Sequence, residues 1–84
     1  MIDAKLATEK AIEKFNAFYP EAKKVQLEEV ELSSDKKLWL VTLGFDSDEL
    51  ASPTQLIIGK MKRYKVFHMD AESGELLHMK GRIL

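Results

Sequence analysis

The sequence predicts an α+β fold, in which an N-terminal helix packs on one face of an antiparallel sheet of three or four strands in meander order. Three features indicate it: an amphipathic helical stretch at the start, apolar segments with strand-like spacing after it, and a hairpin signal near the end. Sequential strands with short connections usually pair as neighbours, which gives the meander. We expect a single domain over residues 1–84, without repeats or linkers.

The helix is predicted from about residue 4 to residue 18. Asp3 can cap the first free amides, and Pro20 stops the helix because proline pushes the preceding residue out of the α region. At roughly 100° per residue, the apolar side chains fall on one side. Phe15 and Phe18 bring the most area, so we expect the helix to dock through them. The apolar side consists of Ala4, Ala7, Ala11, Ile12, Phe15, Phe18 and Tyr19.

The first strand is predicted within residues 25–32, with an irregularity. Val25 and Leu27 alternate with polar residues, but Val30 and Leu32 resume one residue out of phase. A β-bulge near residues 28–29 would reconcile the two phases. The glutamates of this stretch suit an edge strand, because charge there discourages pairing with another chain.

Residues 38–45 are predicted to form the central strand. The run is apolar except for Thr42 and Gly44, which is typical of a strand covered on both faces, or of one whose second face is buried in an oligomer. Leu38 and Leu40 share one face. The other face, which we expect against the helix, carries Trp39, Val41, Leu43 and Phe45.

The next segment is predicted to be a polar loop over residues 46–54, broken by Pro53. Two interpretations of residues 55–58 stay open: a short separate strand, or the start of a long strand that continues through a bulge at Gly59 into residues 62–69. We favour the long strand, since no further turn signal follows Gly59.

Residues 63–79 carry the hairpin signal. Asp70 can accept hydrogen bonds from amides two and three residues on, Ser73 can add a weaker bond, and Gly74 is expected at positive φ. With a loop over residues 71–74, His68 would pair with Leu77 and Phe67 with His78. The two histidines would then lie on opposite faces and could not share a metal ion. A three-residue loop would change the pairing but would still supply no third ligand of the usual type nearby.

Three stretches together resemble PepSY and PepSY-like domains. They are the helix running into Tyr19-Pro20-Glu21-Ala22-Lys23-Lys24-Val25, the aromatic-bearing strand, and Tyr64-Lys65-Val66 leading to Asp70-Ala71-Glu72-Ser73-Gly74-Glu75-Leu76-Leu77. These domains are small α+β modules of peptidase propeptides and many exported bacterial proteins. The resemblance implies a helix on an antiparallel sheet, a role in binding or inhibiting a protein partner, and no catalytic residues. The chain departs from the pattern in its longer loop before the hairpin and in lacking an export signal.

The composition limits the kinds of partner, chemistry and location that we expect. The net charge is −1, and basic and acidic residues are interleaved, so we expect no nucleic-acid partner. No apolar run approaches the roughly 20 residues that a membrane span requires. The absence of cysteine excludes disulfides and thiol catalysis. We expect a cytoplasmic protein as given, and an exported one if a signal peptide has been removed.

Several acidic residues and methionines are candidates for chemical sites. The acidic stretch Asp46, Asp48 and Glu49 lacks calcium-site spacing, and no facing carboxylate accompanies the glutamates of the first strand. Methionine fills irregular cores more often than it recognises ligands. We therefore expect no enzyme, no cofactor, and no catalytic or metal residue. The other candidates are Glu28, Glu29, Glu31, Met61, Met69 and Met79.

The function that we predict is a small non-catalytic interaction module that binds or inhibits an unidentified protein partner. The alternative is a small-ligand or metal-binding domain that uses the open sheet face or the residue 46–49 loop. One helix can cover only one sheet face, yet apolar side chains occupy both. We predict a homodimer as the second cover; the other candidate is the 46–58 loop folded back over that face.

Overall fold

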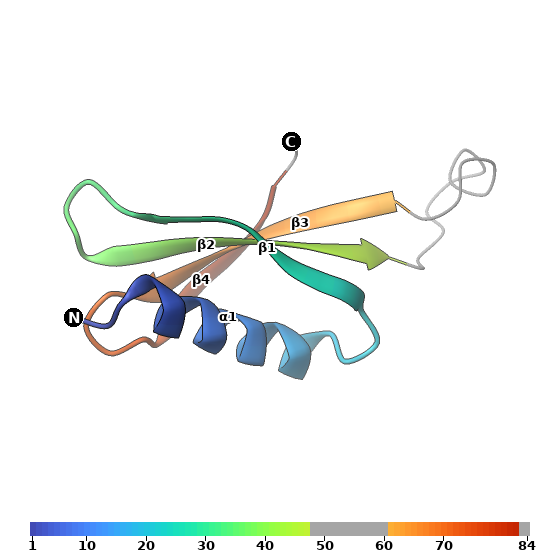
Figure 1. Ribbon diagram of the computed structural model, residues 1–84, viewed down its shortest axis with the longest axis horizontal. Helices are drawn as coiled ribbons and strands as arrows, with labels where there is room; N and C mark the ends of the chain where they lie inside the picture. Colours follow the sequence, from blue (N-terminus) through green and yellow to red (C-terminus); the bar gives the residue numbers. More distant parts are fainter. Residues whose placement is uncertain (48–60, 83–84) are drawn as a thin grey trace.

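The computed structural model describes residues 1–47 and 61–82. Within them lie one helix and four strands: α1 (Ala4–Phe18), β1 (Lys23–Leu32), β2 (Leu38–Ser47), β3 (Met61–Asp70) and β4 (Leu76–Arg82). The strands form one antiparallel sheet in the order β1-β2-β3-β4, and α1 packs against one face of it (Figure 1). The predicted α+β class and meander order are confirmed.

Both ends of α1 are closed by local hydrogen bonds. The Asp3 carboxylate accepts a hydrogen bond from the Leu6 amide at 2.8 Å, which satisfies one of the free donors of the first turn. At the other end, the Tyr19 amide donates to the Phe15 carbonyl at 2.8 Å, and Pro20 follows. The predicted bounds of the helix are confirmed.

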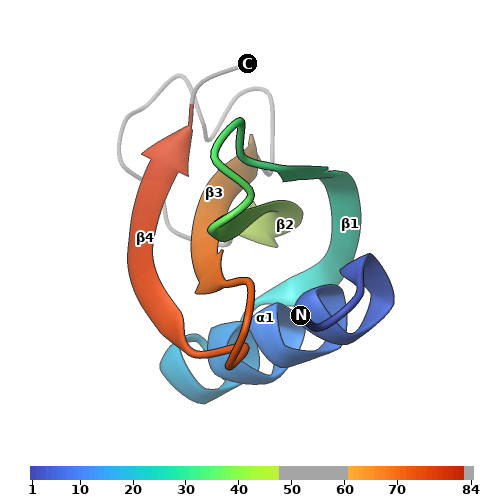
Figure 2. The same cartoon turned by 90° about the vertical axis from the view of Figure 1, so that its left-hand side faces the viewer.

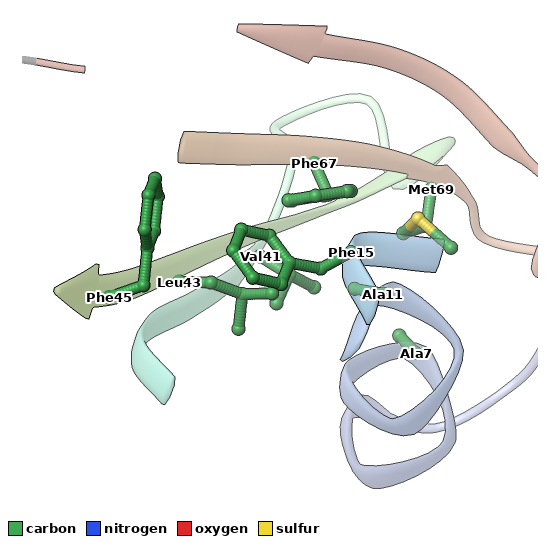
Figure 3. Close-up of a cluster of buried hydrophobic side chains, with 8 residues drawn as sticks. All are labelled: Ala7, Ala11, Phe15, Val41, Leu43, Phe45, Phe67 and Met69. Carbon is green, nitrogen blue, oxygen red and sulfur yellow. The ribbon is translucent and has the colours of Figure 1, made fainter. Parts of the chain in front are cut away.

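The core lies between α1 and the inner face of the sheet (Figure 3). Ala7 and Ala11 have small side chains, which let the helix backbone approach the strands. Phe15 packs against the sheet one turn beyond Ala11, with its ring centroid 4.8 Å from that of Phe45 and 6.2 Å from that of Phe67. The face of β2 that was expected against the helix does pack there. The buried cluster consists of Ala7, Ala11, Phe15, Val41, Leu43, Phe45, Phe67 and Met69.

The expected docking role of Phe18 is wrong, because its side chain is 55% exposed. Tyr19 takes its place and stacks on Phe45 at 6.3 Å between ring centroids. Phe18 follows Phe15 by three residues and so points roughly 60° to one side, whereas Tyr19, four residues on, deviates by roughly 40° to the other side. The C-cap position also lets the Tyr19 backbone leave helical geometry and bring its ring onto the sheet.

Figure 2 views the end of the molecule where the N-terminus and the β3–β4 turn lie. Hydrogen bonds between segments far apart in sequence tie this end together. The Ile2 amide donates to the Ala71 carbonyl at 2.8 Å, and the Ala71 amide donates to the Lys37 carbonyl at 2.9 Å. The Trp39 indole N–H donates to the Ile2 carbonyl at 3.0 Å. These bonds fix the N-terminus and the β3–β4 turn against β2.

β1 is an edge strand and carries the expected bulge. Leu27 pairs with Leu43 and Glu29 with Thr42, so Glu28 is the extra residue. A second register shift lies between Lys23 and Gln26 and was not predicted. It includes Lys24 at φ 55, in the left-handed region that non-glycine residues seldom occupy.

β2 extends further than predicted. The loop was expected to begin at Asp46, but Asp46 and Ser47 continue the strand and pair with Lys62 and Met61. The Asp46 carboxylate also lies 3.8 Å from the Lys24 ammonium, which favours its position at the sheet end. Residues 48–60, with the two interpretations of the segment before Gly59, lie outside the described residues. In the described part of the chain, no helix combines the length and apolar character needed to cross a membrane.

The β3–β4 turn has the predicted chemistry. Asp70 accepts hydrogen bonds from the amides of Glu72 and Ser73 at 2.8 and 3.0 Å, and Gly74 has φ 76. The Ser73 hydroxyl accepts a further bond from the Glu75 amide at 3.1 Å. The Asp70 amide donates to the Glu75 carbonyl at 2.7 Å, which closes the loop over residues 71–74.

The Asp70 cap predicts an acid-sensitive contribution to stability. The Ser73 amide, followed by the Glu72 amide, lowers the pKa of the Asp70 carboxyl. A lowered folded-state pKa contributes stability that is present above the unfolded value of about 3.9 and is lost as the pH falls through the folded value. We expect Asp70→Asn to be less stable than wild type near neutral pH, and the gap to narrow as the pH falls below about 4. Urea denaturation of both proteins across this range measures it; a gap that is constant with pH would contradict the assignment.

Candidate functional site on the open face of the sheet

The face of the sheet opposite α1 is the candidate site, and we call it the open face. Directly paired residues of antiparallel strands project to the same side, so the register identifies its members. Three rows of partners cross it toward β4. They are Glu31, Leu40, His68 and His78; then Glu29, Thr42, Val66 and Lys80; then Gly44, Tyr64 and Arg82.

The centre of the open face carries three apolar side chains, beside Thr42 and His68. Leu40 on β2 and Val66 and Tyr64 on β3 are partly buried there. They lie on the two inner strands, so their neighbours on either side come from β1 and β4. A surface of this kind, apolar in the middle and polar around it, is typical of a site that contacts another molecule.

The two margins of the open face carry opposite charges. On the β1 margin, Glu29 and Glu31 are exposed. On the β4 margin, Lys80 is exposed and Arg82 is partly buried. The face therefore has an acidic and a basic side in a chain whose net charge is only −1. Such a distribution favours a partner whose charges are arranged in the reverse order.

Arg82 links the basic margin to the acidic one across the face. Its Nη1 atom donates to the Thr42 hydroxyl at 3.1 Å and to the Glu29 carboxylate at 3.3 Å. The guanidinium thus extends over β3 and supplies a hydrogen-bond donor to the hydroxyl of Thr42, a buried polar residue. Sequence reasoning missed this residue, because its contacts join positions 53 and 40 residues apart.

A second ion pair crosses the face above Gly44. The Lys62 ammonium lies 3.1 Å from the Glu28 carboxylate. A Cβ atom at Gly44 would lie 2.9 Å from the Lys62 side chain and 3.0 Å from that of Glu28, so the missing side chain makes room for the pair. Hydrogen bonds from Gln26, and then from Lys62, lower the pKa of the Glu28 carboxyl.

The two histidines lie side by side, which corrects the sequence expectation. His68 pairs with His78, so both side chains project from the open face, with ring centroids 5.7 Å apart and ring planes at 81°. The expected loop over residues 71–74 is present, and Met69 pairs with Leu76 as that loop requires. A bulge then leaves Leu77 as an extra residue and moves His78 opposite His68.

The environment of His68 favours its neutral form. Burial is the largest cause that lowers the pKa of the His68 imidazole, and the charges of Lys80 and His78 lower it further. Lys80 lies two residues beyond His78 on the same face of β4, and so contributes positive charge at this margin.

The other candidate residues, acidic and methionine, do not gather into a site. Asp46 lies in β2, while Asp48 and Glu49 lie outside the described residues. Met69 is buried in the core and Met79 packs against it, as methionine commonly does; the Met61 side chain is outside the described part. Over residues 1–47 and 61–82, no group of three or more His, Asp or Glu residues is placed to hold a metal ion.

Comparison with known proteins gives no match to a family model, to a curated protein or to a solved structure. The PepSY resemblance therefore stays a prediction from the sequence. The function has to be inferred from the open face itself.

Proposed function

We propose that this domain is a non-catalytic protein-interaction module, as its resemblance to PepSY domains implies, and that the open face is its binding surface. The observation that carries the proposal is the arrangement of that face: an apolar centre of Leu40, Tyr64 and Val66 between an acidic and a basic margin. The only described helix packs on the opposite face, so its apolar side is already used.

The occupant that best fits the open face is a second copy of the chain. When two such sheets pack face to face, a two-fold axis parallel to the strands places β1 of one copy over β4 of the other. A residue then keeps its position along the strand while it moves to the opposite margin. Glu29 of one copy therefore lies over Lys80 of the other, and Glu31 lies over His78.

The charges select this arrangement over the other face-to-face one. A two-fold axis perpendicular to the strands would place β1 over β1, and Glu29 and Glu31 of both copies would then repel each other. With the parallel axis, each favourable contact occurs twice, and the apolar centres of the two sheets lie against each other. Packed sheets are separated by about 10 Å, a distance that side chains of this size span.

An experiment that reverses one charge on each margin of the open face tests the proposal. Glu31 and Lys80 are suitable because both are exposed and neither forms an ion pair within the described part of the chain. We expect the untagged wild type to have twice the 9.6 kDa mass of one chain by light scattering at micromolar concentration. Glu31→Lys and Lys80→Glu should each weaken the dimer. The first faces His78 of the other copy with a second basic group, and the second faces Glu29 of the other copy with a second carboxylate.

The matched control is Glu13→Lys, which makes the same charge change on the exposed side of α1 and should leave the mass unchanged. A wild-type mass of 9.6 kDa that does not rise with concentration would exclude the second copy as the occupant. If the dimer were as stable in each single variant as in the wild type, the parallel-axis arrangement would be excluded.

A further inference from the structure

His68 and His78 form a pair of neighbouring imidazoles on the open face that protein binding does not require. The two residues are direct partners on β3 and β4, and their rings meet at 5.7 Å between centroids. Their backbones belong to a hairpin whose turn is closed by the Asp70 cap and by the bond between the Gly74 amide and the Asp70 carbonyl. The pair is thus held by the sheet and does not depend on a loop.

We propose that His68 and His78 form a two-imidazole binding site for a divalent transition-metal ion of the Zn²⁺ and Cu²⁺ class. Imidazole nitrogen is a ligand that both ions favour. Both ligands come from the same hairpin, so a single chain can form the site. Water fills the remaining coordination positions in a single chain, and in the proposed dimer these positions face Glu31 of the second copy, which lies over His78.

The ring spacing suits a shared ion. A metal ion lies about 2.0–2.1 Å from each ligating nitrogen, and therefore roughly 3.2 Å from the centroid of each ring. Two rings on one tetrahedral ion then have centroids roughly 5.2 Å apart. The observed 5.7 Å is close enough that small side-chain rotations bring one nitrogen of each ring onto the same ion.

The charges around the pair affect metal binding. A metal ion needs the neutral ring with its free lone pair, so protons compete with the metal for each imidazole. Lys80 also opposes metal binding, because its positive charge near the pair repels a cation. Removal of that charge should therefore strengthen metal binding, which separates this site from a general surface effect.

Isothermal titration of the untagged protein with zinc chloride and with copper chloride tests the site. We expect one ion per chain and loss of binding as the pH falls from about 7.5 to about 5.5, where protons compete for the imidazoles. Loss of an outer-shell partner alone costs about 10–100-fold in metal affinity, so His68→Gln and His78→Gln should each weaken binding by at least about tenfold. Lys80→Gln should tighten it, and magnesium, which prefers oxygen ligands, should not bind.

The wild-type protein gives a readout that does not depend on any variant folding. Addition of zinc should shift the ring nitrogen resonances of both histidines together in a ¹H–¹⁵N spectrum. Absence of binding, a shift of only one ring, or wild-type affinity in either glutamine variant would each overturn the site. A dimer that fails to form would leave these expectations unchanged.

Discussion

Phe15→Ala is expected to destabilise the domain by about 3–5 kcal/mol, the range found when a buried phenylalanine is truncated to alanine. Phe15 is fully buried and contacts aromatic rings from both inner strands, Phe45 on β2 and Phe67 on β3. Its removal leaves a cavity between α1 and the sheet, and the Ala7 and Ala11 side chains are too small to fill it. The free energy of unfolding of a native domain is roughly 5–15 kcal/mol, so the variant should lose a large share of its stability and would be close to unfolded at the low end of that range.

Phe18→Ala is the matched control, because it removes the same side chain from the same helix at a position that is 55% exposed. We expect it to cost less than about 1 kcal/mol. Urea denaturation followed by circular dichroism gives both free energies. If the two variants were equally stable, the packing of α1 through Phe15 would be wrong.

The helix and the β1 bulge could be predicted because their signals are local. Asp3 and Pro20 fix the ends of α1, and single apolar residues between polar ones show where the phase of β1 changes. Where two adjacent residues are both apolar, the sequence pattern does not show which of them faces the core. Phe18 and Tyr19 are neighbouring aromatics, and only the packed structure shows that Tyr19 reaches the sheet.

The histidine pair could not be predicted, because two adjacent apolar residues again left the inward-facing one undetermined. Leu76 and Leu77 are two identical apolar residues in succession, so either could be the one that faces inward, and a bulge between them leaves no trace in the pattern. A shift of one residue moves His78 to the other face, which turns two separate histidines into neighbours. The hydrogen bond from Arg82 to Thr42 could not be predicted for another reason. A long side chain can reach several positions, and only the assembled sheet shows which partner lies near it.

Gly74→Val is expected to cost at least about 1–3 kcal/mol through backbone strain. Gly74 has φ 76, a conformation that a β-branched residue adopts only with difficulty. Space is short as well: a Cβ atom there would lie 2.5 Å from the Lys10 side chain and 3.1 Å from that of Ile2. The Lys10 chain can move aside, but Ile2 is held by the bond from its amide to Ala71, so the strain spreads to the end of the molecule that these bonds tie together.

Gly81→Val provides the comparison, because it introduces the same side chain on β4 where a Cβ atom would meet nothing within 4 Å. Valine favours strands, so this variant should be as stable as wild type or slightly more stable. Thermal melts of the two variants should therefore separate clearly, with Gly74→Val the lower. Equal melting temperatures would mean that the turn tolerates a side chain at residue 74 and that the left-handed glycine contributes no measurable stability.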